Sequence, residues 1–141
     1  MTKQTKKHES NCLVAYGIDI FGDRWTLLIL RDMILYGKKR YGDFLDADEN
    51  IATNILADRL KHLEAEGVIL KEQDPENRRS NIYSLTPKGL TLTPVLLEII
   101  QWSGNFISSD RRRKELLKRI RDDRDGLVAE IYARENMPLA K

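Results

Sequence analysis

Residues 51–89, IATNILADRLKHLEAEGVILKEQDPENRRSNIYSLTPKG, decide the fold. With successive residues placed 100° apart, Leu60 and Leu63 fall within about 40° of Leu56, which predicts a helix with one buried face. Gly67 is expected to end this helix. The runs VIL and NIYSL then predict two short strands, joined by a tight turn at DPEN in which Pro75 fixes φ. Arg78 and Arg79 follow that turn and are expected at the tip of the hairpin.

The segments on either side of this stretch predict further helices. In GDRWTLLILRDMILYG, residues 22–37, Asp23 can cap a helix and Gly37 can stop it, and the apolar residues between them leave little polar surface. A shorter helix is expected over 12–21 and a short amphipathic one around Phe44. After the hairpin, an apolar helical stretch covers 90–107. The end of the chain reads as a long charged helix that needs a partner surface.

This order of elements gives the fold class. A helix pair joined by a short turn and followed by a two-stranded hairpin is the winged helix-turn-helix plan. We therefore expect a mainly α (α+β) protein: a helical bundle with a two-stranded β-wing and long C-terminal dimerisation helices. The expected divisions are a flexible basic arm over 1–11, a winged helix-turn-helix domain with dimer helices over 12–107, and a helical dimerisation extension over 108–141.

Composition narrows the function. The chain has 141 residues and a net charge of +2, distributed as +4 over 1–41, −7 over 42–77 and +5 over 78–141. This basic–acidic–basic layout is compatible with a nucleic-acid surface made from the outer segments. No apolar run approaches the roughly 18 to 20 residues that span a bilayer, and the N-terminus lacks a secretory apolar region, so we expect a cytoplasmic protein without membrane contact.

An enzyme is not expected. The chain has two histidines and one cysteine, Cys12, and it contains no glycine-rich phosphate loop, no Cys/His metal cluster and no nucleophile elbow. We therefore expect no catalytic residues, no cofactor and no metal.

Three separated motifs occur in an order typical of one family. They are NCLVAYGIDIFGDRWTLLILRDM (11–33), TNILADRLKHLEAEGVI (53–69) and YSLTPKG (83–89). Together they resemble the HxlR-type transcriptional regulators, relatives of the MarR group, over about Cys12 to Trp102. The resemblance implies a homodimeric bacterial DNA-binding repressor or activator on a pseudo-palindromic operator, without enzymatic activity. It also implies that the recognition helix enters the major groove, that the wing lies over the adjacent backbone or minor groove, and that the first and C-terminal helices form the dimer.

The residues expected to contact double-stranded DNA follow from this plan. On the recognition helix, Asn suits a bidentate contact to adenine, and small residues allow close approach. Asp58 either accepts from cytosine or pairs with Lys61 or His62, and Arg59 clamps either a phosphate or a neighbouring carboxylate. The expected contacts are Thr53, Asn54, Ala57, Asp58 and Lys61 on the recognition helix, Lys38, Lys39, Arg40 and Arg59 at the DNA backbone, and Arg78, Arg79, Ser80 and Asn81 on the wing.

Other features leave alternatives open. The family usually has serine where this chain has Ala52, so the cap of the recognition helix must come from elsewhere, with Asn50 and Thr53 as candidates. Cys12 is either a redox sensor, as in some members of the resembling family, or a structural interface residue. A small effector is compatible with the family, although no residue identifies it. The alternative to a DNA-binding protein is a helical protein–protein interaction module. The expected dimer contacts are Leu13, Ile99, Trp102, Phe106, Leu116, Ile120, Leu127 and Ile131.

Overall fold

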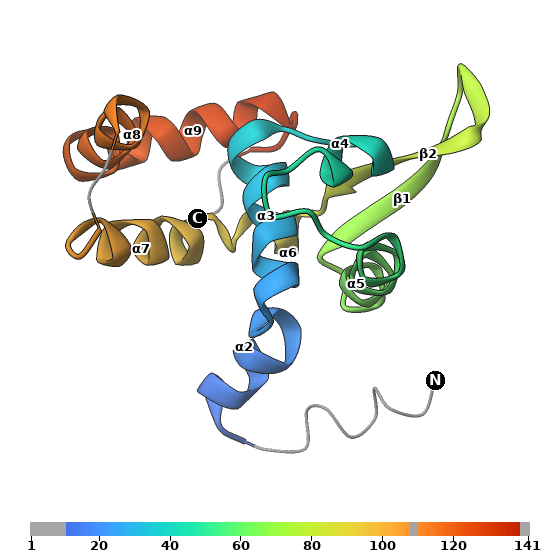
Figure 1. The fold of residues 1–141 in the computed structure, drawn as a ribbon, viewed down its shortest axis with the longest axis horizontal. Helices are drawn as coiled ribbons and strands as arrows, with labels where there is room; N and C mark the ends of the chain where they lie inside the picture. The colour runs from blue at the N-terminus through green and yellow to red at the C-terminus, as the bar shows by residue number, and fades with distance from the viewer. Residues whose placement is uncertain (1–10, 108–109, 139–141) are drawn as a thin grey trace.

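The computed structural model describes residues 11–107 and 110–138, so most of the arm expected over 1–11 lies outside the described residues. It confirms the winged helix-turn-helix fold (Figure 1). The elements are α2 (Leu13–Phe21), α3 (Arg24–Tyr36), α4 (Tyr41–Leu45), α5 (Thr53–Ala65), β1 (Ile69–Asp74), β2 (Asn77–Leu85), α6 (Pro87–Leu90), α7 (Thr93–Gly104), α8 (Arg111–Asp122) and α9 (Arg124–Arg134).

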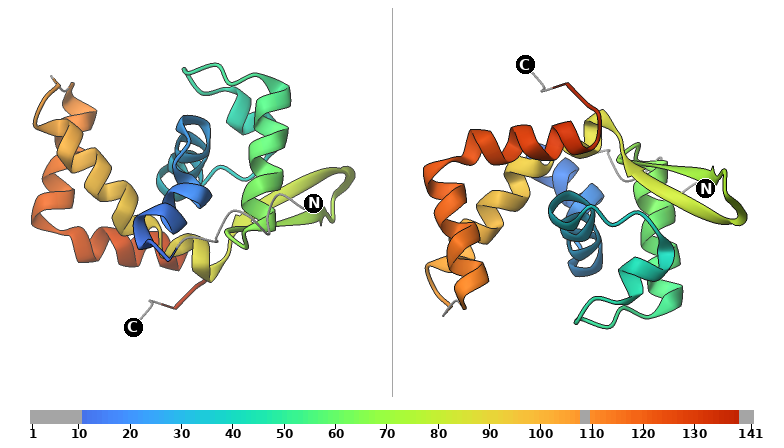
Figure 2. Two further views of the ribbon diagram at one scale, coloured as in Figure 1. Left: turned by 90° about the horizontal axis from the view of Figure 1, so that it is seen from below. Right: turned by 90° about the horizontal axis from the view of Figure 1, so that it is seen from above.

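Helix α3 stands at the centre of the molecule. Helix α5 and the β1–β2 wing lie on one side of it, and α7, α8 and α9 lie on the other (Figure 2). Its side chains Ile29, Leu30, Met33 and Ile34 are buried in a core that also takes side chains from α5, the wing and α9. None of the helices in the described ranges is long and apolar enough to cross a membrane.

The expected ends of α3 are confirmed. The Asp23 side chain accepts a hydrogen bond from the Thr26 N–H, and Gly37 ends the helix in the left-handed conformation, with φ of 64°. For α5 the structure fixes the start at Thr53, with Ala52 at the cap position and no side-chain hydrogen bond there. The predicted caps Asn50 and Thr53 therefore do not replace the missing serine.

The wing strands are longer than the sequence predicted. Strand β2 begins at Asn77 rather than at Asn81, and the turn is confined to residues 75–76. The antiparallel register is regular up to Gln73↔Asn81 and then shifts to Asp74↔Asn77, which leaves residues 78–80 bulged out of the pairing. Arg78 and Arg79 follow the turn, as the sequence predicted, and lie in this irregular part of β2.

The prediction of one long C-terminal helix is wrong. Asp123 separates α8 from α9, and its carboxylate accepts from the Gly126 N–H to cap α9. A Cβ at residue 126 would lie 2.5 Å from that carboxylate, so a side chain there would have to displace it from its present position. The break lets both helices fold back onto the chain's own core. Ile120, Leu127 and Ile131 are only 1%, 8% and 4% exposed, so these three are core residues and not dimer contacts.

Candidate nucleic-acid interface

The recognition helix α5 separates its apolar and polar residues as the sequence predicted. Leu56, Leu60 and Leu63 are buried against the rest of the protein. The predicted base-reading positions lie on the opposite, exposed side, and they are Thr53, Asn54, Ala57, Asp58 and Lys61. The Tyr41 hydroxyl of α4 donates to the Thr53 carbonyl at 2.8 Å, which joins the first helix of the motif to the start of the second.

Arg59 contacts carboxylates of its own chain. Its Nε donates to Asp23 Oδ2 at 2.8 Å, and its Nη1 donates to Asp58 Oδ2 at 2.6 Å. The hydrogen bond from Arg59 is the main cause that lowers the pKa of Asp23 to about 2. Two alternatives were open for Arg59, a phosphate clamp and a contact with a neighbouring carboxylate. The structure shows the contact with a carboxylate. The expected pairing of Asp58 with Lys61 or His62 is replaced by pairing with the adjacent arginine.

Two more polar contacts hold the same flank of α5. His62 Nε2 lies 2.9 Å from the Ile20 carbonyl at the end of α2. Lys88 Nζ, in the TPKG motif, donates to the Glu66 carbonyl at 3.0 Å and to the Tyr16 hydroxyl of α2 at 3.2 Å. Positions 59, 62 and 66 share one helix face by their spacing, which was the available signal for these contacts, but the sequence reasoning assigned no such role to His62 or Lys88.

The loop before α4 holds its basic side chains in ion pairs. Lys38 lies 3.4 Å from Asp32, Lys39 lies 3.2 Å from Glu135, and Arg40 pairs with the buried Asp74 at the end of β1. The structure thus places the three predicted backbone contacts together, each beside a carboxylate. A phosphate would have to compete with those carboxylates for them.

The acidic loop between α4 and α5 is tied to α3. Arg31 donates to Glu49 through Nη1 at 2.8 Å and through Nη2 at 3.0 Å, and it also contacts the buried Asp32. These bonds to Arg31 lower the pKa of Glu49 to about 2. The pairing fixes the loop that precedes the recognition helix and neutralises one of its negative charges.

The wing arginines differ from the loop cations. Arg78 and Arg79 are exposed and form no ion pair with any residue in the described part of the chain. Their backbone is held instead: Gln73 Nε2 donates to the Arg78 carbonyl at 2.8 Å, and the Arg79 N–H donates to Asn77 Oδ1 at 3.2 Å. Asn81 is exposed and Ser80 is half-buried beside them.

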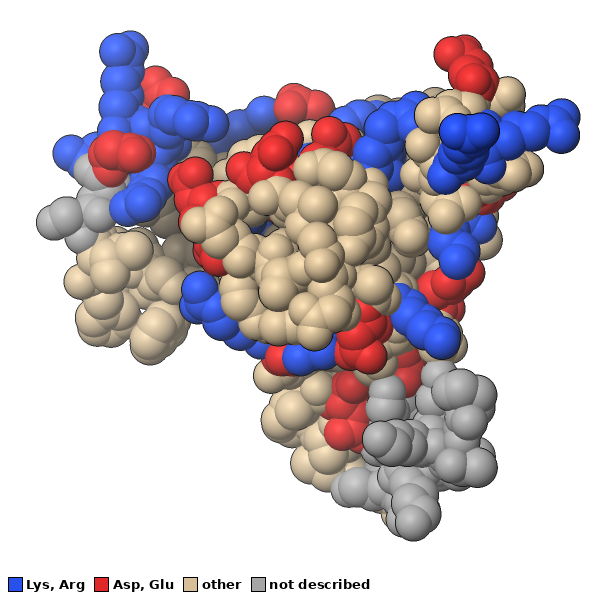
Figure 3. Space-filling model, turned by 45° about the vertical axis from the view of Figure 1, so that its right-hand side comes forward, with Lys and Arg blue, Asp and Glu red and all other residues tan. Residues whose placement is uncertain are grey.

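Basic side chains gather at two corners of the molecule, over the wing and over α8, with acidic side chains between them (Figure 3). Helix α8 lies at the far end from the wing in Figure 1. On the face shown, the basic side chains over the wing and those over α8 form two separate patches. Of these two elements, the wing is the one that packs against α5, through β1.

A different face of the protein carries exposed apolar side chains. Leu13 on α2 is 88% exposed, Trp102 on α7 is 66% exposed, and Phe106 just after α7 is 71% exposed. The Trp102 and Phe106 rings pack on each other at a centroid distance of 4.9 Å. Cys12, at the cap position of α2, is exposed beside Leu13. Leu116 is half-buried against the core, so the apolar face consists of α2 and α7.

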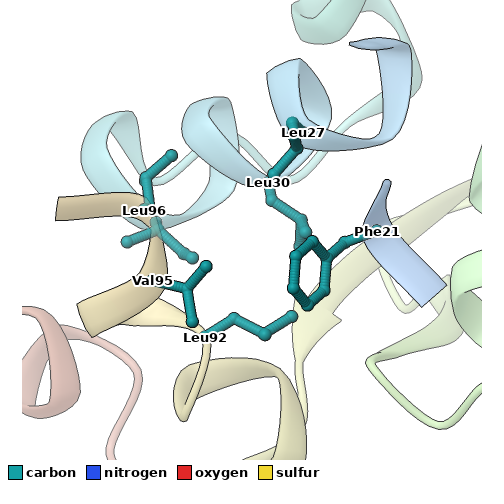
Figure 4. A pocket seen from close by; sticks show the side chains of 7 residues that line it. Phe21, Leu27, Leu30, Leu92, Val95 and Leu96 are labelled. Atoms are coloured by element: carbon teal, nitrogen blue, oxygen red, sulfur yellow. The ribbon is translucent and has the colours of Figure 1, made fainter. Parts of the chain in front are cut away.

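An apolar hollow lies where α2, α3 and α7 meet (Figure 4). Its lining side chains are Phe21, Leu27, Leu30, Ile34, Leu92, Val95 and Leu96. Val95 belongs both to this hollow and to the exposed face of α7. All of the lining side chains are apolar, so the hollow presents no charged group.

Comparisons with known proteins agree with this architecture. The curated relatives include the uncharacterized HTH-type transcriptional regulator YvaP of Bacillus subtilis, 39% identical over 64% of this chain and 82% of that protein. They also include the HTH-type transcriptional regulator YodB of Bacillus subtilis, 33% identical over 62% of this chain and 77% of that protein.

Solved structures give the same result. The redox regulator HypR in its oxidized form superposes with a TM-score of 0.62 at 30% identity, over 70% of this chain and all of HypR. The reduced form of YodB has a TM-score of 0.57 at 29% identity, over 72% of this chain and all of that chain.

The profile of the HxlR-like helix-turn-helix family matches residues 20–111, which include α3, the helix-turn-helix pair, the wing and α7. This match covers well over half of the sequence and agrees with the curated relatives, which are transcriptional regulators. The chain therefore belongs to the HxlR-like helix-turn-helix family of transcriptional regulators.

Proposed function

We propose that the protein binds double-stranded DNA in a sequence-specific manner, as a cytoplasmic homodimer, through α5 and the wing. The proposal rests on two exposed surfaces, the polar face of α5 and the wing. The polar face of α5 is exposed, and the wing beside it presents two arginines without carboxylate partners among the described residues. Cations that have no internal partner can neutralise phosphates without first breaking an ion pair.

The proposed contacts divide into two kinds. Asn54, with Thr53 and Ala57 beside it, reads base edges in the major groove, and Lys61 contacts a phosphate. Arg78 and Arg79 contact phosphate or enter the minor groove. Lys38, Lys39 and Arg40 add backbone contacts only where phosphates displace their carboxylates. Arg59 positions α5 through its contact with Asp23 and does not act as a phosphate clamp.

The homodimer is proposed from the apolar face of α2 and α7. Large exposed apolar side chains on neighbouring helices are typical of an interaction surface, and Trp102 and Phe106 supply the aromatic surface that anchors such interfaces. A two-fold dimer places two copies of α5 on half-sites about one helical turn apart, which matches a pseudo-palindromic operator.

Regulation through Cys12 is part of the proposal. The thiol is exposed at the cap position of α2, the helix that contacts α5 through the Ile20 carbonyl. HypR is a redox regulator, and this chain shares its fold at 30% identity. If Cys12→Ser responds to diamide as wild type does, in DNA binding and in disulfide-linked dimer formation, the thiol is structural. The hollow in Figure 4 is about the size of one water molecule, so a small effector would have to open it further.

Selection of bound fragments from the source genome tests the central proposal, followed by gel retardation over a salt series. We expect retention of a small set of related sequences and an affinity that falls steeply as salt rises. Absence of retardation at low salt, with the fragments nearest the gene included, would contradict DNA binding and favour a protein–protein interaction module.

A further inference from the structure

Helices α8 and α9 lie beyond the part of the chain that the family profile matches. The family profile ends at residue 111, where α8 begins. The structures of HypR and YodB are each matched along their whole length by about seven tenths of this chain. This helix pair does not extend into solvent, because Ile120 and Tyr132 are buried in the same core as the side chains of α3 and α5. Helix α9 ends beside the top of α3 and the start of α4 (Figure 1).

The end of α9 caps α3. Arg134 Nη2 donates to the carbonyl oxygens of Met33 at 2.9 Å and Ile34 at 2.7 Å. The last carbonyls of a helix lack partners within the helix, and a cation there is favoured by the helix dipole. A Cβ at Gly37 would lie 3.3 Å from Arg134 Nε, so the guanidinium lies directly against the residue that ends α3.

Glu135 connects this cap to the basic loop. Its side chain is only 4% exposed, and its carboxylate accepts from Arg134 Nε at 3.1 Å and from Lys39 Nζ at 3.2 Å. A buried carboxylate needs such partners, because an unpaired buried charge is strongly unfavourable. The contact between Glu135 and Lys39 joins residues 96 positions apart in the sequence.

The same loop is attached to both strands of the wing. The Lys39 carbonyl accepts from the Tyr83 N–H of β2 at 2.8 Å. The next residue, Arg40, pairs with the buried Asp74 at the end of β1. A continuous set of polar contacts therefore runs from α9 through residues 39 and 40 to β1 and β2.

We infer that α8 and α9 form a brace that sets the position of the wing, with Arg134 and Glu135 as its positioning residues. The inference rests on the proposed DNA binding for its effect on function. The brace holds the loop at residue 39, and the loop holds the wing. The wing arginines therefore keep a fixed distance from α5 when they contact DNA. Loosening the brace weakens the wing contacts and leaves the base contacts of α5 unchanged.

Glu135→Gln gives a test in which two explanations predict opposite signs. The substitution removes one negative charge, so simple electrostatics predicts tighter DNA binding. The brace predicts weaker binding of the selected DNA, on the order of threefold to tenfold, the loss expected when one contact of a coupled polar network is removed. Glu130→Gln is the matched control. It removes the same charge from α9, but Glu130 is exposed and pairs with Arg119 on α8.

A second readout separates positioning from general stability. Arg79→Ala is introduced into wild type, Glu135→Gln and Glu130→Gln, and thermal unfolding confirms that each variant is folded. The brace predicts that Arg79→Ala costs a smaller factor in affinity beside Glu135→Gln than beside Glu130→Gln. If Glu135→Gln unfolds at the assay temperature, Arg134→Lys replaces it, since lysine keeps the charge but loses the two-carbonyl contact.

The outcomes are distinguishable. If wild type binds DNA and Glu135→Gln binds as tightly as Glu130→Gln, or if Arg79→Ala costs the same factor beside both, the brace is wrong and the proposed function stands. If wild type binds no DNA, the proposed function fails, and hydrogen exchange of the Tyr83 amide decides the brace. That amide should exchange about tenfold faster in Glu135→Gln than in Glu130→Gln, because opening of a local contact raises exchange. Equal rates would overturn the brace.

Discussion

One oxygen of Asp23 serves two helices. Asp23 Oδ2 accepts from the Thr26 N–H at 2.9 Å, which caps α3, and from Arg59 Nε at 2.8 Å, which attaches α5. The central helix and the recognition helix therefore share an anchor at the end of α2. A change at this carboxylate would move the reading surface relative to the core.

Asp23→Asn should keep the cap and lose the ion pair, because asparagine is also a good cap residue. We expect a lower free energy of unfolding than in wild type at pH 7. The pKa of Asp23 is lowered from 3.8 to about 2, so its stabilising contribution is complete above about pH 4 and is lost as pH falls towards 2. Urea unfolding at a series of pH values should show the two proteins converging over that interval.

The matched control for this series is Asp58→Asn, since Asp58 contacts the same arginine from an exposed position. Its effect at pH 7 should be smaller, because exposed ion pairs contribute little. A difference between Asp23→Asn and wild type that persists undiminished at pH 2 would show that the ion pair is not its cause.

Arg79→Ala should weaken binding to all DNA sequences about equally. Loss of one phosphate contact lowers the slope of log affinity against log salt by about 1 per half-site. Fluorescence anisotropy with the selected DNA and an unrelated duplex, each at several salt concentrations, measures both quantities. Arg112→Ala on α8 removes the same charge at the far end from the wing and should leave the slope unchanged. Equal slopes for Arg79→Ala and wild type would show that Arg79 contacts no phosphate and is an ordinary solvated residue.

Asn54→Ala and Lys61→Ala should weaken DNA binding in different ways. The amide of Asn54 is proposed to read a base, so its loss should cost about 1–3 kcal/mol on the selected DNA and relax the preference at one base pair. Loss of Lys61 should weaken all sequences together. Binding to a set of operators with single base changes tests the distinction. An unchanged base preference in Asn54→Ala would place the reading residue elsewhere on α5.

Trp102→Glu should produce a monomer. A carboxylate in place of Trp102, whose ring packs on Phe106 in the exposed apolar face, would be desolvated without a partner in the proposed dimer. Light scattering at micromolar concentration measures the mass, and circular dichroism confirms that the variant is folded. Leu70→Glu is the control, because Leu70 is also an exposed apolar residue but lies on β1 of the wing. A wild-type protein that is already a monomer would refute the interface.

The local features of the fold could be predicted from the sequence because their causes are local. Neighbouring residues determine the apolar spacing of Leu56, Leu60 and Leu63, the cap at Asp23 and the stop at Gly37. The structure confirms all three features. The exposed face of α5 followed from the same spacing. The order of the elements followed from these local patterns, and the resemblance of three motifs indicated the family, which the family profile confirms.

The errors concern contacts between distant residues. Ile120, Leu127 and Ile131 form an apolar face whether a partner subunit or the chain itself covers it, and periodicity cannot distinguish the two. The break at Asp123 decides the matter by folding α9 back. Asp23 lies 36 positions from Arg59, and Glu135 lies 96 positions from Lys39, so no local pattern could reveal these two ion pairs.

The start of α5 lacks a side-chain cap at Ala52, and this affects how its binding energy divides between main chain and side chains. The first N–H groups of a helix have no acceptor within it, and at α5 no side chain takes their place. Against a DNA backbone these amides are donors for a phosphate, supported by the positive end of the helix dipole. A main-chain contribution of this kind is present in every side-chain variant. The losses measured by substitution along α5 will therefore sum to less than the whole affinity of the helix for its operator.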